Sequence, residues 1–128
     1  MSIQENILEG IKASLSGLVS GNVFRDRREQ IANLPAIAIE PEVADEQEEV
    51  LGFTDGIMTV AVMVYAAGDI PSTAADTVIA SVKAVMVPGY DFGLGNDIQL
   101  LPGVSQEWDF ENFDYVRVSL RYRVQYRS

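Results

Sequence analysis

Carboxylates are the residues best suited to chemistry in this sequence. Its 128 residues include 19 aspartates and glutamates but no histidine and no cysteine. Those two absences exclude Ser–His hydrolases, Cys–His proteases, thiol redox enzymes and zinc sites built from cysteine or histidine. Pairs such as Asp109 and Glu111 suit general acid–base catalysis, but a sequence this rich in acids contains such pairs by chance. We therefore expect a protein that has no catalytic residues and is not an enzyme.

The densest run of carboxylates, in residues 40–56, raises the question of a calcium site. Calcium-binding loops place oxygen ligands at alternate positions around a glycine, whereas this segment is mostly glutamate without that spacing. A second motif, Gly93-Leu94-Gly95-Asn96, lacks the preceding strand, following helix and lysine that a phosphate-binding loop needs. We therefore predict no metal site and no cofactor, and interpret residues 40–56 as a solvated polar loop.

The arginines near the end of the sequence depart from its overall charge. Residues 116–128 contain four arginines and no acid, although the net charge is -10. These arginines could pair with acids on neighbouring strands, meet the acidic segment of another copy, or bind nucleic acid. The net charge opposes nucleic-acid binding and membrane binding. The other two interpretations both stay open, because arginine often anchors protein interfaces.

The charged segments together define a candidate interface with another subunit or a partner. It combines the arginine-rich segment near residue 25, the acidic loop and the arginines of the final segment. Its members are Arg25, Arg27, Arg28, Glu42, Asp45, Glu46, Glu48, Glu49, Arg121 and Arg123.

Two amphipathic helices are predicted among the elements that must position these residues. Ser2 followed by Glu5 is a capping-box pattern, and apolar residues then recur at helical spacing as far as the sequence Ser20-Gly21-Asn22. The second helix is expected to begin with Ser72 or Thr73 as its cap and to end before Pro88-Gly89.

Strands account for most of the remaining sequence. The clearest runs from residue 116 to residue 127, where apolar residues alternate with polar or basic ones. The segment Ile57 to Tyr65 is apolar on both faces, which predicts a central strand. Weaker strands are expected at residues 34–39, at 98–101 and, as an edge strand or an extended arm, at 23–29.

The order of these elements predicts one domain spanning residues 1–128. Its fold class is α+β, with two helices packed on a mainly antiparallel sheet in the order α-β-β-β-α-β-β. Residues 41–55 are expected to be poorly ordered unless a neighbouring molecule holds them. No run approaches the roughly 18 to 20 apolar residues of a membrane span. Glu5 and Glu9 stand where a signal peptide would carry lysine or arginine, so we expect the protein to stay where it is made.

Several short motifs, taken in order, suggest a family. They are the N-terminal helix, Val23-Phe24-Arg25-Asp26-Arg27-Arg28, Leu34-Pro35-Ala36-Ile37, the acidic segment, a hydrophobic strand, the Gly68-Asp69 turn, the second helix, and Arg121-Tyr122-Arg123-Val124-Gln125-Tyr126-Arg127. This series resembles the tail terminator proteins of long-tailed bacteriophages and prophages, of the minor tail protein U type. The resemblance covers nearly the whole chain, and no motif in it is diagnostic alone.

The resemblance implies a structural function. Proteins of that family form a hexameric ring that caps the finished tail tube, ends its elongation and offers a docking surface to the head. The implied partners are other copies of the chain, the tail tube protein and the head connector or completion protein. The implied location is the bacterial host cytoplasm during assembly and then the virion tail. Another tail-completion or head–tail joining protein, or a small monomeric or dimeric binding adaptor, is the alternative.

Overall fold

The computed structural model describes residues 2–26, 33–48, 53–95, 97–110 and 115–127. Two α-helices and five strands follow the order predicted, and a sixth, short strand is added before the last, so the α+β fold class is confirmed. The elements are α1 (Ile3–Leu15), a 3-10 turn η1 (Ser16–Val19), β1 (Val23–Arg25), β2 (Ala36–Glu48), β3 (Thr54–Ala66), α2 (Pro71–Val85), β4 (Ile98–Leu100), β5 (Ser105–Asp109) and β6 (Val116–Arg127).

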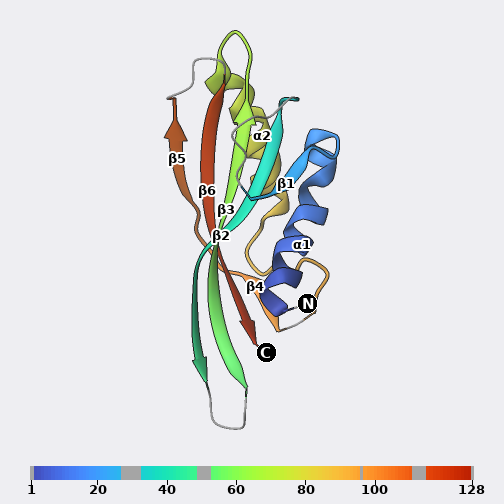
Figure 1. Ribbon diagram of the computed structural model, residues 1–128, viewed down its shortest axis with the longest axis vertical. Coiled ribbons are helices and arrows are strands. Elements are labelled where there is room, and N and C mark those ends of the chain that lie inside the picture. Colours follow the sequence, from blue (N-terminus) through green and yellow to red (C-terminus); the bar gives the residue numbers. More distant parts are fainter. Residues whose placement is uncertain (1, 27–32, 49–52, 96, 111–114, 128) are drawn as a thin grey trace.

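The strands form one sheet in the order β1-β2-β3-β6-β4 (Figure 1). The edge strand β1 runs parallel to β2, and the other pairs are antiparallel. Because β3 pairs with β6 along its whole length, β5 and β4 lie one after the other along the opposite edge of β6. The long strands β2, β3 and β6 therefore form the frame that positions the charged residues.

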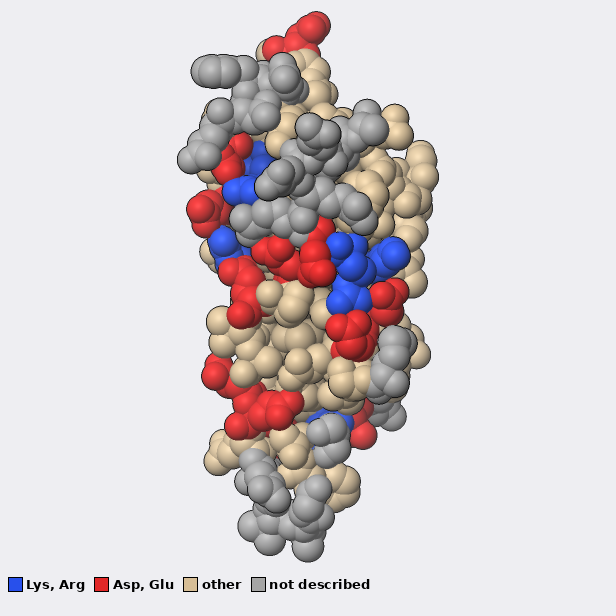
Figure 2. All heavy atoms as spheres, in the orientation of Figure 1, with Lys and Arg blue, Asp and Glu red and all other residues tan. Residues whose placement is uncertain are grey.

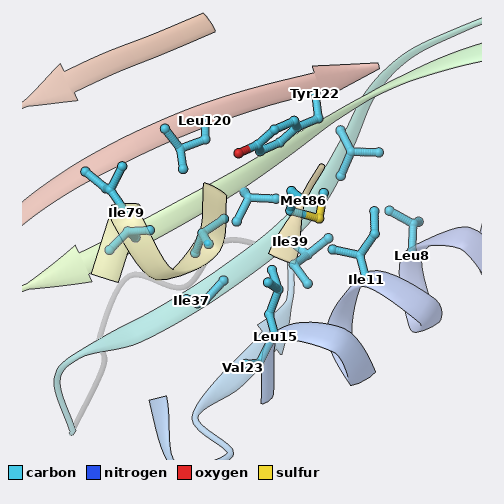
Figure 3. Packing of buried hydrophobic residues seen from close by; sticks show 14 of the residues in the cluster. Leu8, Ile11, Leu15, Val23, Ile37, Ile39, Ile79, Met86, Leu120 and Tyr122 are labelled. Atoms are coloured by element: carbon cyan, nitrogen blue, oxygen red, sulfur yellow. The ribbon is translucent and has the colours of Figure 1, made fainter. Parts of the chain in front are cut away.

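Both helices pack on one face of this sheet, and the main hydrophobic core lies between the helices and that face. Figure 3 shows Leu8, Ile11 and Leu15 of α1 near Ile37 and Ile39 of β2. The apolar half of the alternation in β6 faces the same core: Val116, Val118, Leu120, Tyr122, Val124 and Tyr126 are all buried. The arginines of β6 must consequently lie on the opposite face, because successive side chains in a strand point in opposite directions.

The face without helices also has a small buried cluster. It contains Ala36 and Ala38 of β2 with Ala61, Met63 and Tyr65 of β3. From Val60 to Ala66, β3 is therefore buried on both faces, which confirms the prediction of a central strand.

The starts of the two helices differ from each other. At α1 the Ser2 hydroxyl accepts a hydrogen bond from the Glu5 amide at 3.1 Å, as the capping pattern predicted. At α2 the prediction of a Ser72 or Thr73 cap is wrong. The helix begins at Pro71 after Ile70, without a side-chain cap, because proline suits the first helical position and has no amide hydrogen to satisfy there.

The acidic segment is a β-hairpin, so the prediction of a loop over residues 40–56 is wrong for its described part. β2 continues to Glu48 and β3 begins at Thr54, with their ladder interrupted by one extra residue, Glu42. Pairing with β3 overrides the low strand preference of acidic residues. The expected disorder of residues 41–55 in the absence of a neighbouring molecule stays a prediction, and residues 49–52 lie outside the described chain.

One end of this hairpin projects beyond the helices. We call its outer part, Val43–Glu48 of β2 and Thr54–Thr59 of β3, the arm. In Figure 1 the arm extends past α1 at one end of the molecule, while the turn between β3 and α2 lies at the other end.

Candidate functional site

Arg121 of β6 connects β2 and β5 across the face that carries no helix. Its Nε donates to Glu42 of β2 at 2.7 Å, and its Nη1 donates to Glu107 of β5 at 2.8 Å. The hydrogen bond to Glu107 raises the pKa of Arg121 most, and Glu42 adds to this, against a lowering by burial. Glu42 is the extra residue between two ladder positions. The bulge therefore lets its carboxylate reach over β3 to an arginine two strands away.

Two other arginines of β6 also pair within the chain. Arg117 donates to Asp109 of β5 at 2.5 Å, and Arg127 donates to both carboxylate oxygens of Asp55 on β3, at 2.6 and 3.1 Å. Of the two interpretations that the sequence left open, pairing across the sheet is thus confirmed for Arg117, Arg121 and Arg127. Contact of Arg121 and Glu42 with another copy stays a prediction.

Arg123 behaves differently from these three arginines. Its side chain is exposed and its Nη2 donates to the Pro102 carbonyl oxygen at 3.4 Å. It forms no ion pair with any carboxylate in the described part of the chain. An open hollow of about 540 Å³ lies beside it, and the lining includes Asp45, Ile57 and Thr59 of the arm.

A second connection ties the arm to the helical side. The Tyr126 hydroxyl donates to Glu46 of β2 at 2.6 Å and accepts from Gln4 of α1 at 3.0 Å. Gln4 also donates to Glu46 at 3.1 Å. Burial raises the pKa of Tyr126 most, and the bond to Glu46 adds to this, while the bond from Gln4 lowers it. Glu46 is exposed, but it is bound within the chain by one residue near each terminus, Gln4 and Tyr126.

Gly56 makes this connection geometrically possible. It stands opposite Tyr126 on one side and opposite Glu46 on the other. A β-carbon at Gly56 would lie 2.5 Å from the Tyr126 hydroxyl oxygen and 2.7 Å from Cε2. The tyrosine ring consequently crosses β3 over a residue that has no side chain.

The remaining predicted interface residues are distributed over the molecule. Arg25 of β1 pairs with Glu5 and Glu9 of α1, at 3.1 and 2.7 Å. Its hydrogen bond to Glu5 raises its pKa most, burial opposes this and Glu9 adds to the rise. Asp45 is exposed on the arm. Arg27, Arg28 and Glu49 lie outside the described residues, as does the side chain of Glu48.

Sequence reasoning missed the part that Gln4, Gly56 and Tyr126 play. A glycine inside a strand signals a close approach by a neighbour, and Gly56 precedes the apolar run of β3. The partner could not be identified, however, because Tyr126 lies 70 positions further along the chain.

The chemistry available on this surface is pairing of charges and contact with other molecules. Within the described residues, no three carboxylates gather closely enough to hold a metal ion. No helix in that part of the chain is both long and apolar enough to cross a membrane. On the face that Figure 2 shows, the described basic residues lie next to acidic ones and form no continuous basic surface.

Comparison with known proteins gives a structural match. No protein-family model and no curated protein match this sequence. A chain of a solved structure described as "Virion of native gene transfer agent (GTA) particle" superposes with a TM-score of 0.69. The two chains share one fold. The match covers 95% of this chain and 95% of the other, at 18% sequence identity.

Proposed function

We propose that this chain is a structural protein of a phage or phage-like particle, and more narrowly a tail terminator. In this function, copies of the chain form a ring that caps the completed tail tube, ends its elongation and offers a surface to the head. The single observation that carries the proposal is the fold shared, over 95% of both chains, with a chain of a gene transfer agent virion. The resemblance in sequence motifs supports the same function.

The distribution of charge supports a contact function and not catalysis. On the strands, Glu42 and Asp55 each pair with an arginine, and Glu46 accepts a hydrogen bond from the Tyr126 hydroxyl. A general acid or base needs instead a proton-exchanging group that faces a substrate. We accordingly propose that the protein is not an enzyme.

The same distribution of charge opposes binding to DNA. Binding to duplex DNA relies on phosphate contacts from a basic patch, usually within a basic domain. Here Arg117, Arg121 and Arg127 already bind carboxylates of their own chain, and the net charge is -10. A ring of such subunits would let DNA pass without holding it.

The arm supplies a surface suited to assembly. It projects past α1 (Figure 1). On the helical side of the sheet Tyr126 binds Glu46 of the arm, and on the other face Arg121 binds Glu42, the residue just before the arm. Because these ties hold its direction before any partner arrives, less ordering is needed on binding.

Coexpression with the tail tube protein of the same genome tests the proposal. Electron microscopy with a labelled chain is expected to show the label at one end of each tube, and tubes of limited length. Unlabelled tubes that grow to the same length with and without this chain would contradict it. A chain that stays a monomer or dimer and binds another protein would favour the adaptor function.

A further inference from the structure

Arg123 is the arginine of β6 that binds no carboxylate among the described residues. Each of the other three binds at least one carboxylate of this chain, whereas Arg123 makes one long hydrogen bond to a carbonyl oxygen. A guanidinium group has five N–H donors in a rigid fork that matches a carboxylate. Arg123 therefore offers an unfilled site for an acidic group.

The surroundings of Arg123 are partly apolar. Val43 and Thr59 lie in the same row of the sheet as Arg123, and Ile57 lies in the next row, opposite Gln125. Val43 is 53% exposed and Ile57 is 39% exposed. Arginine beside apolar side chains is the composition found at the energetic centres of protein interfaces. We call Val43, Ile57, Thr59 and Arg123 the Arg123 surface.

A ligand for this surface needs a carboxylate next to an exposed apolar side chain. In the described chain, Asp69 and Ile70 have this chemistry: Ile70 is 63% exposed, the most of any large apolar residue there, and Asp69 is exposed and in no ion pair. By contrast, the acids close to Phe53 and Phe110, which are Asp55 and Asp109, are already bound by arginines.

The position of Asp69 and Ile70 excludes contact with Arg123 of the same copy. They lie in the turn between β3 and α2, at the end of the molecule opposite the arm (Figure 1). A second copy can present that turn to the Arg123 surface of the first. Contacts between two different surfaces of identical chains close into rings when the rotation between copies permits.

We propose that the Arg123 surface of one copy binds the Asp69–Ile70 turn of the next copy. The carboxylate of Asp69 accepts hydrogen bonds from the Arg123 guanidinium, and the Ile70 side chain packs on Val43 and Ile57. This inference rests on the proposed ring and names the contact that builds it.

Reversing the charge at each position, and then swapping the two charges, tests the contact. The variant Arg123→Asp is expected to raise the dissociation constant of self-association by about 30-fold or more, and Asp69→Arg by a similar factor, as for residues at the centre of an interface. The double variant Arg123→Asp with Asp69→Arg is expected to return to within about 5-fold of the original value, because the pair is restored in reverse.

Lys83 provides a matched control, because its exposed side chain bonds Gln106 on the helical side of the sheet. Lys83→Asp makes the same change in charge and is expected to alter self-association by less than about 3-fold. Sedimentation velocity over a range of concentrations measures all four variants, and their thermal unfolding shows that each is folded.

The outcomes separate this contact from the proposed function. If the original chain assembles and Arg123→Asp assembles equally well, the contact is wrong while the ring stands. A double variant as weak as either single one also overturns the contact. If the original chain stays a monomer at every concentration and on the tube, both the ring and the contact are wrong.

Discussion

Replacing Gly56 by alanine is expected to destabilise the protein through Tyr126. The new methyl group would lie 2.5 Å from the tyrosine hydroxyl oxygen, so the ring has to move away from β3. Moving it breaks the 2.6 Å hydrogen bond to Glu46 and the 3.0 Å bond from Gln4.

The size of the effect follows from these contacts. A hydrogen bond to a charged group contributes about 1.5 to 3 kcal/mol, and overpacking costs about 1 to 3 kcal/mol. Alanine is otherwise preferred to glycine within a strand by roughly 0.5 to 1 kcal/mol. We therefore expect Gly56→Ala to lower the free energy of unfolding by about 3 kcal/mol, with the clash and the lost bonds outweighing the gain in backbone entropy.

Urea unfolding of Gly56→Ala, in the original chain and in a Tyr126→Ala variant, measures this loss of stability. In the original chain the transition midpoint should fall by roughly 1.5 M, for a slope of about 2 kcal/mol per M. In a Tyr126→Ala background there is no ring to displace, so Gly56→Ala should be neutral or slightly stabilising. An equal loss of stability in both backgrounds would refute the account of the Tyr126 connection.

Two further substitutions test the buried hydroxyl and the central arginine. Burial raises the pKa of Tyr122 from 10.0 to about 12. The stability that its neutral form contributes is therefore complete below pH 10 and is lost as the pH rises through 12, by up to about 3 kcal/mol. Tyr122→Phe should remove this pH dependence and be neutral or stabilising at pH 7, because the hydroxyl is buried without a hydrogen-bond partner in the described chain; a clear loss in urea unfolding at pH 7 would count against it. Arg121→Ala should lower the free energy of unfolding by about 1 kcal/mol, whereas Arg123→Ala should change it little, since its side chain is exposed. Equal effects in thermal unfolding would show that the two arginines do not differ in function.

The sequence predicts elements whose side chains alternate between core and solvent. In β6 the alternation from Val116 to Arg127 assigned both the strand and the arginine face, and the apolar run of β3 marked a central strand. The prediction from sequence failed for residues 40–48, where an acidic composition is typical of a loop but the backbone pairs with β3. It also missed β5, where Trp108 and Phe110 are interspersed with acids.

The sequence identified which charged residues belong to the candidate site, but not which residues they pair with. Arg121 and Glu42 were both chosen for their charge, yet 79 positions separate them and their pairing depends on the bulge in β2. Arg123 looked equivalent to Arg121 in the sequence, because the two occupy alternate positions of one strand. Their difference arises from where the strands β2 and β5 place their carboxylates, which no local pattern records.

The mass of the assembled protein tests the central claim most directly. Native mass spectrometry and sedimentation velocity, with the chain alone and bound to tail tubes, would measure it. We expect closed assemblies, with a hexamer of about 84 kDa, six times the 14.0 kDa of one chain. A chain that remains at 14.0 kDa at every concentration and salt, and that does not bind the end of a tube, would contradict it.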